Sequence, residues 1–279
     1  DAGEPAVDGG SSDSQPGEPT SDAEPFDDST GEPEPTQEPT PMGEPDPEWL
    51  LSIDNGTDYL QRVDIATGAT TNICKLPSSG ITGGIFTPIS YPSLTFSRTN
   101  ILYASRGGNF LDAIDPCTCE VMPIGSYGGP SGVNGITSDY GAGLFGVAVN
   151  QDETIAIDTN TGFAEIVGAL GFNFGSTGAT WSEAESLLYA IDATTDGLYT
   201  ISPQTGAATF VKSLTKDFGT VGIELHPANG KIYACSSDAH LVEVDPVTGT
   251  VTDIGDMNQQ GSCTNLAAPW AKVECIEPD

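Results

Sequence analysis

The chain has 279 residues with 40 acidic against 8 basic side chains, which gives a formal charge of −32. This balance argues against nucleic acid and anionic membranes as partners, because both favour Lys and Arg near phosphate. No apolar run approaches the ~20 residues that span a bilayer, so no transmembrane segment is expected.

Residues 1–48 differ in composition from the rest of the chain. They hold fifteen acidic side chains, ten prolines and no basic side chain. With so few apolar residues to offset the entropy of ordering, residues 1–48 are predicted to be a disordered, extended linker. Such a linker either tethers a domain to a bacterial cell surface, with a lipid anchor upstream of Asp1, or only adds solubility. In an exported protein, a signal segment would also have preceded Asp1.

From residue 49 onward, one short phrase returns five times. The steps between its last residues are 51, 43, 44 and 43 positions. The five copies are VDIATG at Val63–Gly68, IDPCTC at Ile114–Cys119, IDTNTG at Ile157–Gly162, ISPQTG at Ile201–Gly206 and VDPVTG at Val244–Gly249. A period of about 40–50 residues built from short strands indicates a β-propeller with one blade per period.

Each period contains four strand-like pieces separated by turn residues. In the fourth period they are Gly178–Ser182, Leu187–Asp192, Gly197–Ile201 and Ala207–Val211. The repeated phrase is predicted to be the hairpin turn between the third and fourth strands, where aspartate accepts backbone N–H bonds. A metal-binding role for these aspartates is the alternative. The second strand always carries a small residue, which lets neighbouring blades pack closely: Ser52, Ala104, Gly146, Ala190 and Ala234.

The two ends of the repeat region complement each other. The first period begins at its second strand, Trp49–Asp54, and an unmatched first strand remains at Cys263–Pro269. Residues 49–279 are therefore predicted to form an all-β, five-bladed β-propeller of four-stranded antiparallel blades. In this prediction the C-terminal strand joins blade one, and the protein is expected to be a monomer. A larger ring built from two chains, or an open array, is the alternative.

The pattern "LY-x-hydrophobic-Asp … hydrophobic-Asp-x-x-Thr-Gly", as in Leu188–Asp192 and Ile157–Gly162, resembles the repeats of quinoprotein-like, YVTN-type and NHL-type propellers. The resemblance covers Trp49 to about Trp270 and implies the fold without naming a ligand. Quinone-binding propellers carry a tryptophan after each turn glycine. Here ATTNI, FAEIV, AATFV and TVTDI follow instead, so no quinone cofactor is expected.

Six cysteines in an acidic chain that looks secreted favour disulfides over zinc: Cys74, Cys117, Cys119, Cys235, Cys263 and Cys275. Zinc would need a second close pair or a nearby His to complete four ligands. Cys117 and Cys119 share one hairpin and are predicted to bond to each other, although a longer link or a redox role remains an alternative. The other four cysteines are then expected to staple the ring closure.

The predicted strand directions place two sets of loops on one rim: those between blades, and those between second and third strands. Aromatic residues recur in the loops between blades, and these are candidates for stacking on a ligand: Phe86, Tyr91, Tyr127, Phe174 and Phe218. The alternative is that each ring fills the gap between two blades. The second-to-third-strand loops are acidic, so calcium is an alternative to the expected absence of any cofactor.

A catalytic constellation is not visible in the sequence. The only two histidines, His226 and His240, are expected to be solvated turn residues. Glu224 stands where other inner strands carry Thr95, Thr137, Thr180 and Leu266, and one carboxylate does not make a mechanism.

The sequence therefore favours an exported, non-enzymatic module, extracellular or at the cell surface, that binds or scaffolds protein or glycan. The alternatives are an extracellular hydrolase or lyase acting on a sugar or lactone, with or without a metal, and a purely structural module.

Overall fold

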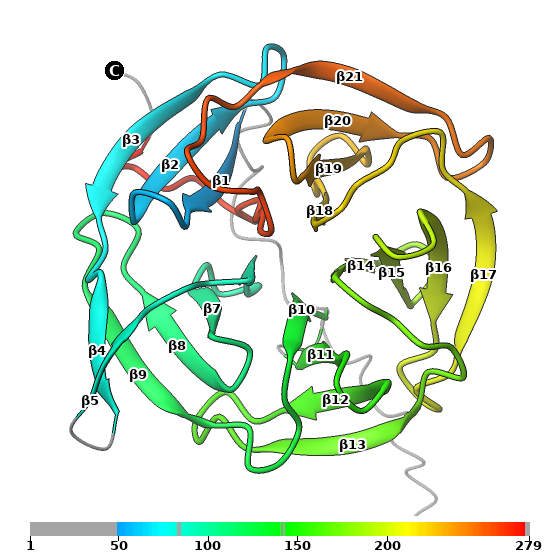
Figure 1. Cartoon of the computed structure of the whole chain (residues 1–279), viewed down its shortest axis with the longest axis horizontal. Helices are drawn as coiled ribbons and strands as arrows, with labels where there is room; N and C mark the ends of the chain where they lie inside the picture. Colours follow the sequence, from blue (N-terminus) through cyan, green and yellow to red (C-terminus); the bar gives the residue numbers. More distant parts are fainter. Residues whose placement is uncertain (1–48, 83–84, 140, 142, 277–279) are drawn as a thin grey trace, which may run out of the picture. The chain divides into compact units, whose positions relative to one another are not determined.

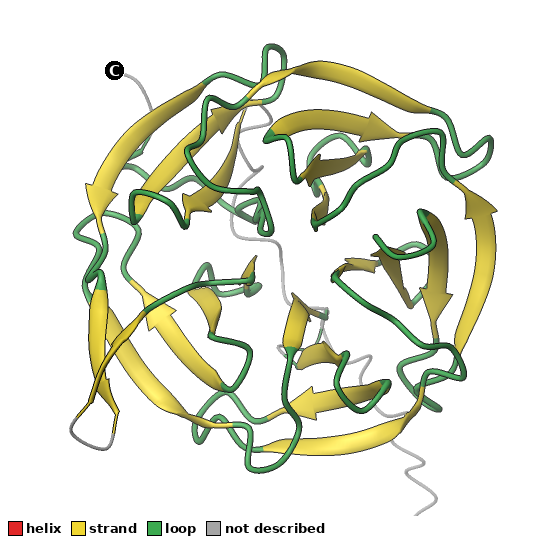
Figure 2. Ribbon diagram, in the orientation of Figure 1, coloured by secondary structure: helices red, strands yellow, loops and turns green. Residues whose placement is uncertain are grey.

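The computed structural model describes residues 49–82, 85–139, 141 and 143–276, all within the unit Pro41–Asp279. The predicted linker 1–48 lies outside the described residues. In the described part every regular element is a strand, and five sheets surround a central axis (Figures 1 and 2). Across these residues no helix is long and apolar enough to cross a membrane. The predicted all-β, five-bladed propeller is confirmed.

Blades two to five each contain four antiparallel strands, which run in chain order from the axis outward (Figure 1). Blade two is β6 (Ser93–Phe96), β7 (Leu102–Arg106), β8 (Phe110–Ile114) and β9 (Val121–Ser126). Blade three is β10 (Val133–Ser138), β11 (Leu144–Ala148), β12 (Glu153–Ile157) and β13 (Ala164–Ala169). Blade four is β14 (Thr177–Ser182), β15 (Leu187–Asp192), β16 (Gly197–Ile201) and β17 (Ala208–Ser213). Blade five is β18 (Val221–Leu225), β19 (Ile232–Ser236), β20 (His240–Val244) and β21 (Val251–Asp256).

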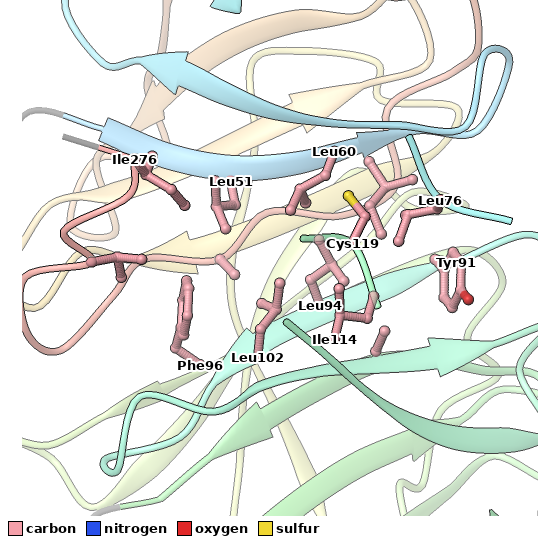
Figure 3. Packing of buried hydrophobic residues seen from close by; sticks show 14 of the residues in the cluster. Leu51, Leu60, Leu76, Tyr91, Leu94, Phe96, Leu102, Ile114, Cys119 and Ile276 are labelled. Carbon is pink, nitrogen blue, oxygen red and sulfur yellow. The ribbon is translucent and has the colours of Figure 1, made fainter. Parts of the chain in front are cut away.

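Blade one is assembled from both ends of the folded region. Its outer three strands are β1 (Trp49–Asp54), β2 (Tyr59–Asp64) and β3 (Thr70–Lys75). A hairpin that the sequence pattern did not predict, β4 (Ser79–Thr82) with β5 (Ile85–Pro88), follows before blade two. Blades one and two then share a core that includes Leu51, Leu60, Leu94, Leu102 and Ile114 (Figure 3).

The repeated phrase forms the predicted hairpin turns. Asp64 accepts hydrogen bonds from the backbone N–H groups of Ala66 and Thr67, both at 2.9 Å, and Asp115, Asp158 and Asp245 repeat this arrangement. The last residue of each phrase has a positive φ, between 60° and 76°, which favours glycine: Gly68, Cys119, Gly162, Gly206 and Gly249. These aspartates are thus occupied in holding the turns.

Each of these turns also contacts the outer strand of the preceding blade. A Cβ built on Gly162 would lie 2.8 Å from the Gly125 backbone, and one built on Gly68 would lie 2.6 Å from the Gly255 carbonyl oxygen. Gly206 meets Gly168 in the same way. The outer strand has a register shift beside this contact in every blade, which is a β-bulge or similar irregularity. Glycine is therefore needed where two backbones pack together.

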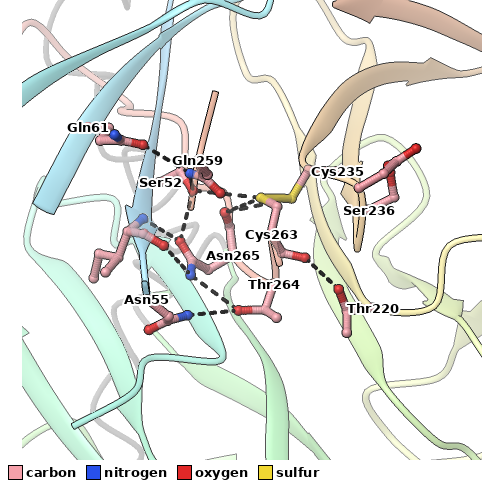
Figure 4. The surroundings of a disulfide bond; sticks show 12 residues. Ser52, Asn55, Gln61, Thr220, Cys235, Ser236, Gln259, Cys263, Thr264 and Asn265 are labelled. Carbon is pink, nitrogen blue, oxygen red and sulfur yellow. Dashed lines mark hydrogen bonds between the residues drawn. A yellow bond between two sulfur atoms is a disulfide. The ribbon is translucent and has the colours of Figure 1, made fainter. Parts of the chain in front are cut away.

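The ring closes where the C-terminal segment runs antiparallel to β1. Leu51 and Ala267 exchange two backbone hydrogen bonds, of 2.8 and 3.0 Å, as an isolated bridge. The Asn265 side chain, shown in Figure 4, extends this pairing. Its Oδ1 accepts from the Ile53 N–H at 2.6 Å, and its Nδ2 donates to the carbonyls of Ile53 and Tyr91. The predicted closure is confirmed, with one side chain replacing part of the strand ladder.

All six cysteines form disulfides, but the predicted Cys117–Cys119 bond is wrong. The pairs are Cys74–Cys119, Cys117–Cys275 and Cys235–Cys263. Cys119 occupies the turn-glycine position, and the outer-strand residue facing that position in the preceding blade is Cys74. Their Cα atoms lie 5.8 Å apart, which suits a cystine. A disulfide thus replaces the glycine–glycine contact between blades one and two.

Replacing Asn265 with alanine should weaken the closure. The change leaves the buried Ile53 N–H without its partner and removes one of the donors to the Tyr91 carbonyl, which keeps a hydrogen bond from Asn55. The free energy of unfolding should therefore fall by about 1–3 kcal/mol. Equilibrium denaturation of the disulfide-intact protein measures this loss. Asn160→Ala, at an exposed turn, is the matched control and should change stability little. Equal stability of the two variants would contradict the assigned role of Asn265.

Position 119 should prefer glycine once its disulfide is removed. In a Cys74→Ser background, Cys119→Gly should be more stable than Cys119→Ser by about 1 kcal/mol, because φ at this position is +60°. Thermal and chemical unfolding of the two double variants provide the comparison. A more stable serine variant would show that this turn is not equivalent to the glycine turns of the other blades.

Candidate functional site

The two sets of loops predicted to share one rim are hydrogen-bonded to each other. Asp152 accepts from the Phe174 N–H at 2.8 Å, and Asp196 accepts from the Phe218 N–H at 3.0 Å. In the same way Asp54 accepts from the N–H groups of Gln260 and Gly261, at 3.1 and 3.0 Å. The acidic loops therefore serve as acceptors for the loops between blades.

The predicted rim aromatics are placed between blades. Tyr91, Tyr127, Phe174 and Phe218 are all less than 10 % exposed, so neighbouring residues cover most of each ring, and Tyr91 also lines a crevice beside Arg106 and Asp112. This geometry fits the alternative in which each ring fills a gap between blades. The fifth candidate, Phe86, lies in β5, and its side chain is outside the described part of the structure.

Phe174 shows how such a gap is filled. Its ring centroid lies 4.8 Å from that of Tyr199, and Phe172 and Phe210 pack edge-on against the same ring at 5.2 and 5.5 Å. The loop before blade four thus supplies two aromatic rings, and strands β16 and β17 supply one each. This four-residue aromatic cluster occupies the space beside the outer strands of blade four.

Blade one carries four amides at the equivalent positions. The row Ala190, Tyr199 and Phe210 in blade four corresponds by strand pairing to Ser52, Gln61 and Asn72 in blade one. The loops before blades four and one can be aligned through one equivalent hydrogen bond. The Gly175 N–H donates to Asp192 Oδ1 at 2.9 Å, and the Gly261 N–H donates to Asp54 Oδ1 at 3.0 Å. This alignment places Asn258 and Gln260 where blade four has Phe172 and Phe174.

The four amides line an open crevice of about 490 Å³ between blades five and one. The lining residues are Asp54, Thr57, Tyr59, Gln61, Thr70, Thr71, Asn72, Asn258 and Gln260. We call this the amide crevice. Gln61 is held in place, since its Nε2 donates to Asn72 Oδ1 at 2.8 Å and its Oε1 accepts from Gln259 Nε2 at 3.1 Å. Asn258 and Gln260 are exposed.

Asp54 is the one charged residue in this lining, and its carboxylate is fully engaged. Burial opposes its ionisation, yet hydrogen bonds from Gln260, Thr57, Gly56 and Gly261 together hold its pKa below the ordinary value. The carboxylate thus organises the loop around the amide crevice and has little capacity left for a cation.

Two other crevices have a different character. One of about 260 Å³ in blade two contains a buried ion pair, in which Arg106 Nε donates to Asp112 Oδ2 at 2.7 Å. Burial raises the pKa of the Asp112 carboxyl, and Arg106 opposes that rise. The other, of about 360 Å³, is lined by residues of blade three that include Phe145, Phe163 and Glu165. Each combines apolar side chains with charged groups, whereas the amide crevice is almost uncharged.

Glu224 is buried and hydrogen-bonded to the neighbouring inner strands. Ala267, not Leu266, takes its position in blade one, because Ala267 pairs with Leu51 as Glu224 pairs with Tyr233. Burial raises the pKa of Glu224 well above its ordinary value, against hydrogen bonds from the Ala268 N–H and the Thr180 hydroxyl. The carboxyl group therefore links the inner strands of blades four, five and one.

The histidines are also engaged. His226 is fully buried, so the prediction of a solvated turn residue is wrong for it; its Nε2 lies 3.3 Å from the carbonyl oxygen of Trp49. His240 Nδ1 lies 2.8 Å from Asp253 Oδ1 near the surface. Within the described ranges, no three His, Cys, Asp or Glu side chains cluster as they would to hold a metal ion.

The comparisons with known proteins bear on the fold alone. No protein-family model matches the chain, and no curated protein matches it. A chain from a crystal structure of a nidogen/laminin complex is similar, with a TM-score of 0.56, 10% identity, and coverage of 80% of this chain and 99% of that one. A structural-genomics protein of unknown function from Bacteroides thetaiotaomicron is similar with a TM-score of 0.52 and 14% identity. That match covers 81% of this chain and 60% of the other.

Protonation of Glu224 should be visible in the pH dependence of stability. Because its pKa is raised in the folded state, its contribution is fully present below the unfolded pKa of about 4.3 and is lost as pH rises through the folded value. The Glu224→Gln variant stays neutral, so its stability relative to the native chain should increase between pH 4 and pH 7. Urea denaturation at both pH values, with Glu165→Gln as an exposed control, measures this difference. A constant difference would contradict a raised pKa.

Proposed function

We propose that this chain is an exported, non-catalytic binding module, extracellular or at the cell surface, whose ligand is a protein or a glycan. The exchange of four aromatic residues for four amides at the junction of blades five and one supports this most directly. The loop position that carries Phe174 before blade four and Phe218 before blade five carries Gln260 before blade one. Beside it, Gln61 and Asn72 stand where blade four has Tyr199 and Phe210. A crevice of about 490 Å³ is within the range of ligand pockets.

The cysteines and the overall charge support the proposed location. Three disulfides are typical of oxidising compartments outside the cytosol. The acidic linker predicted at residues 1–48 would hold the propeller away from a surface, and a lipid anchor upstream of Asp1 is part of this proposal. The charge of −32 again argues against nucleic acid as a ligand. The likeness to a chain of a nidogen/laminin complex adds a precedent for this fold within a protein assembly.

Binding fits the geometry better than catalysis. Glu224 accepts hydrogen bonds from Ala268 and Thr180. His226 lies against the Trp49 carbonyl, and His240 against the Asp253 carboxylate. Neither a cofactor nor a calcium ion is part of the proposal, because the acidic loops direct Asp54, Asp152 and Asp196 at backbone N–H groups.

The proposal predicts retention of a ligand without turnover. The full chain should be applied to arrays of glycans and of extracellular protein domains, and the bound material should be recovered and analysed by mass spectrometry. We expect at least one ligand to be retained chemically unchanged, and Gln260→Phe to abolish its retention. Conversion of a bound sugar or lactone to product would favour the hydrolase or lyase alternative. Complete absence of binding would favour a purely structural module.

A further inference from the structure

We propose that the amide crevice recognises a neutral carbohydrate, a proposal that rests on the proposed binding function and names its ligand class. Seven of the nine lining residues are Asn, Gln or Thr, which carry amide or hydroxyl groups, and Tyr59 adds a phenol. Each Asn or Gln side chain offers two N–H donors and a carbonyl acceptor, and each hydroxyl both donates and accepts. Sugar hydroxyls present the same mixture of donors and acceptors.

The lining of the crevice favours an uncharged ligand, although one cation is close to it: Lys75 Nζ lies 5.5 Å from the centroid of the Tyr59 ring. The folded region, residues 49–279, carries 25 acidic and 8 basic side chains, a net charge of −17, so a neutral patch is a departure from its surroundings. Asp54 is the single ionisable carboxylate in the lining, and four hydrogen bonds already occupy it. An anionic ligand would find no cation in this lining, and a cationic ligand would find no unengaged carboxylate.

Several polar groups in the crevice remain available to a ligand. Among the described residues, no hydrogen bond is made by the side chain of Gln260, by Asn72 Nδ2 or by the Thr71 hydroxyl. Asn258 Nδ2 donates to the Asp256 carbonyl, and its Oδ1 accepts no hydrogen bond from the part of the chain that the structure describes. These groups come from strand β3 and from the loop that follows β21, so they can address several hydroxyls of one sugar at once.

A carbohydrate suits this crevice better than a folded protein partner. Stable protein interfaces depend on buried aromatic or Arg anchors within a large contact area. The amide crevice has lost the aromatic residues that blade four carries, and its lining is polar and concave. The fixed orientation of Gln61 and Asn72, which are hydrogen-bonded to each other at 2.8 Å, lowers the entropy cost of binding a small polar ligand.

Blade four supplies the substitutions that test this proposal. Gln260→Phe and Asn72→Phe introduce the residues found at Phe174 and Phe210, and they should fill the crevice without disturbing the fold, since both positions are exposed. Gln204→Phe, in the exposed turn between β16 and β17, is the matched control. Equilibrium unfolding of all three variants should be close to that of the native chain.

The probes are neutral cello-, manno-, xylo- and galacto-oligosaccharides, with oligogalacturonate as the anionic comparison. Isothermal titration calorimetry of the full chain should show saturable binding of at least one neutral probe and none of oligogalacturonate. Gln260→Phe and Asn72→Phe should each weaken binding at least tenfold, and Gln204→Phe should leave it unchanged.

The proposal is overturned if no neutral probe binds, if oligogalacturonate binds as well as the neutral probes, or if both crevice variants bind like the native chain. Binding to a protein domain that Gln260→Phe abolishes, with no oligosaccharide binding, would overturn the carbohydrate assignment and leave the proposed binding function intact. If no glycan and no protein domain binds, both the carbohydrate assignment and the proposed binding function are wrong.

Discussion

The antiparallel pairing of Leu51 with Ala267 is the constraint on which the rest of the propeller depends. A ring of blades has no sheet that can close on itself, so the last blade must be joined to the first by contacts that span the whole sequence. Here two backbone hydrogen bonds and the Asn265 side chain make that joint, and the Cys235–Cys263 disulfide fixes the C-terminal segment to blade five. The Cys117–Cys275 disulfide fixes its end to blade two.

The closing junction differs from neighbouring junctions in the residue that its loop places between the blades. Elsewhere, aromatic rings such as Phe174 and Phe218 fill the space between blades, and glycines let the turns contact the preceding outer strand. Between blades five and one the glycine contact is kept at Gly68 and Gly255, but Gln260 replaces the aromatic ring. Closure therefore supplies the stability of this junction while the adjacent crevice is left open. A site beside a rigid, disulfide-fixed joint is well placed to hold a ligand without reorganising.

Local signals in the sequence were sufficient for the architecture. The turn phrase that ends at Gly162 is held by hydrogen bonds within the turn and by a positive φ, so each copy of the phrase in the sequence marks one blade. The unmatched strand near Ala267 indicated that the ring closes. The disulfide between Cys74 and Cys119 could not be predicted in this way. Its partners meet only because the outer strand is irregular at Ile73 and because turns contact the blade before them. The sequence shows Gln260 before a glycine in the loop where Phe174 and Phe218 stand before theirs. Gln61 and Asn72 join Gln260 only through the strand register, which the sequence does not show.

Hydrogen exchange at the closing joint tests the closed ring most directly. In a closed propeller the amides of Leu51 and Ile53 are buried and bonded to Ala267 and Asn265, so they should exchange only through global unfolding, as slowly as amides in the middle of β15. If the Leu51 and Ile53 amides instead exchange as fast as those of exposed loops while β15 stays protected, the first and last segments are not joined, and the ring is open at the junction where the binding site is proposed.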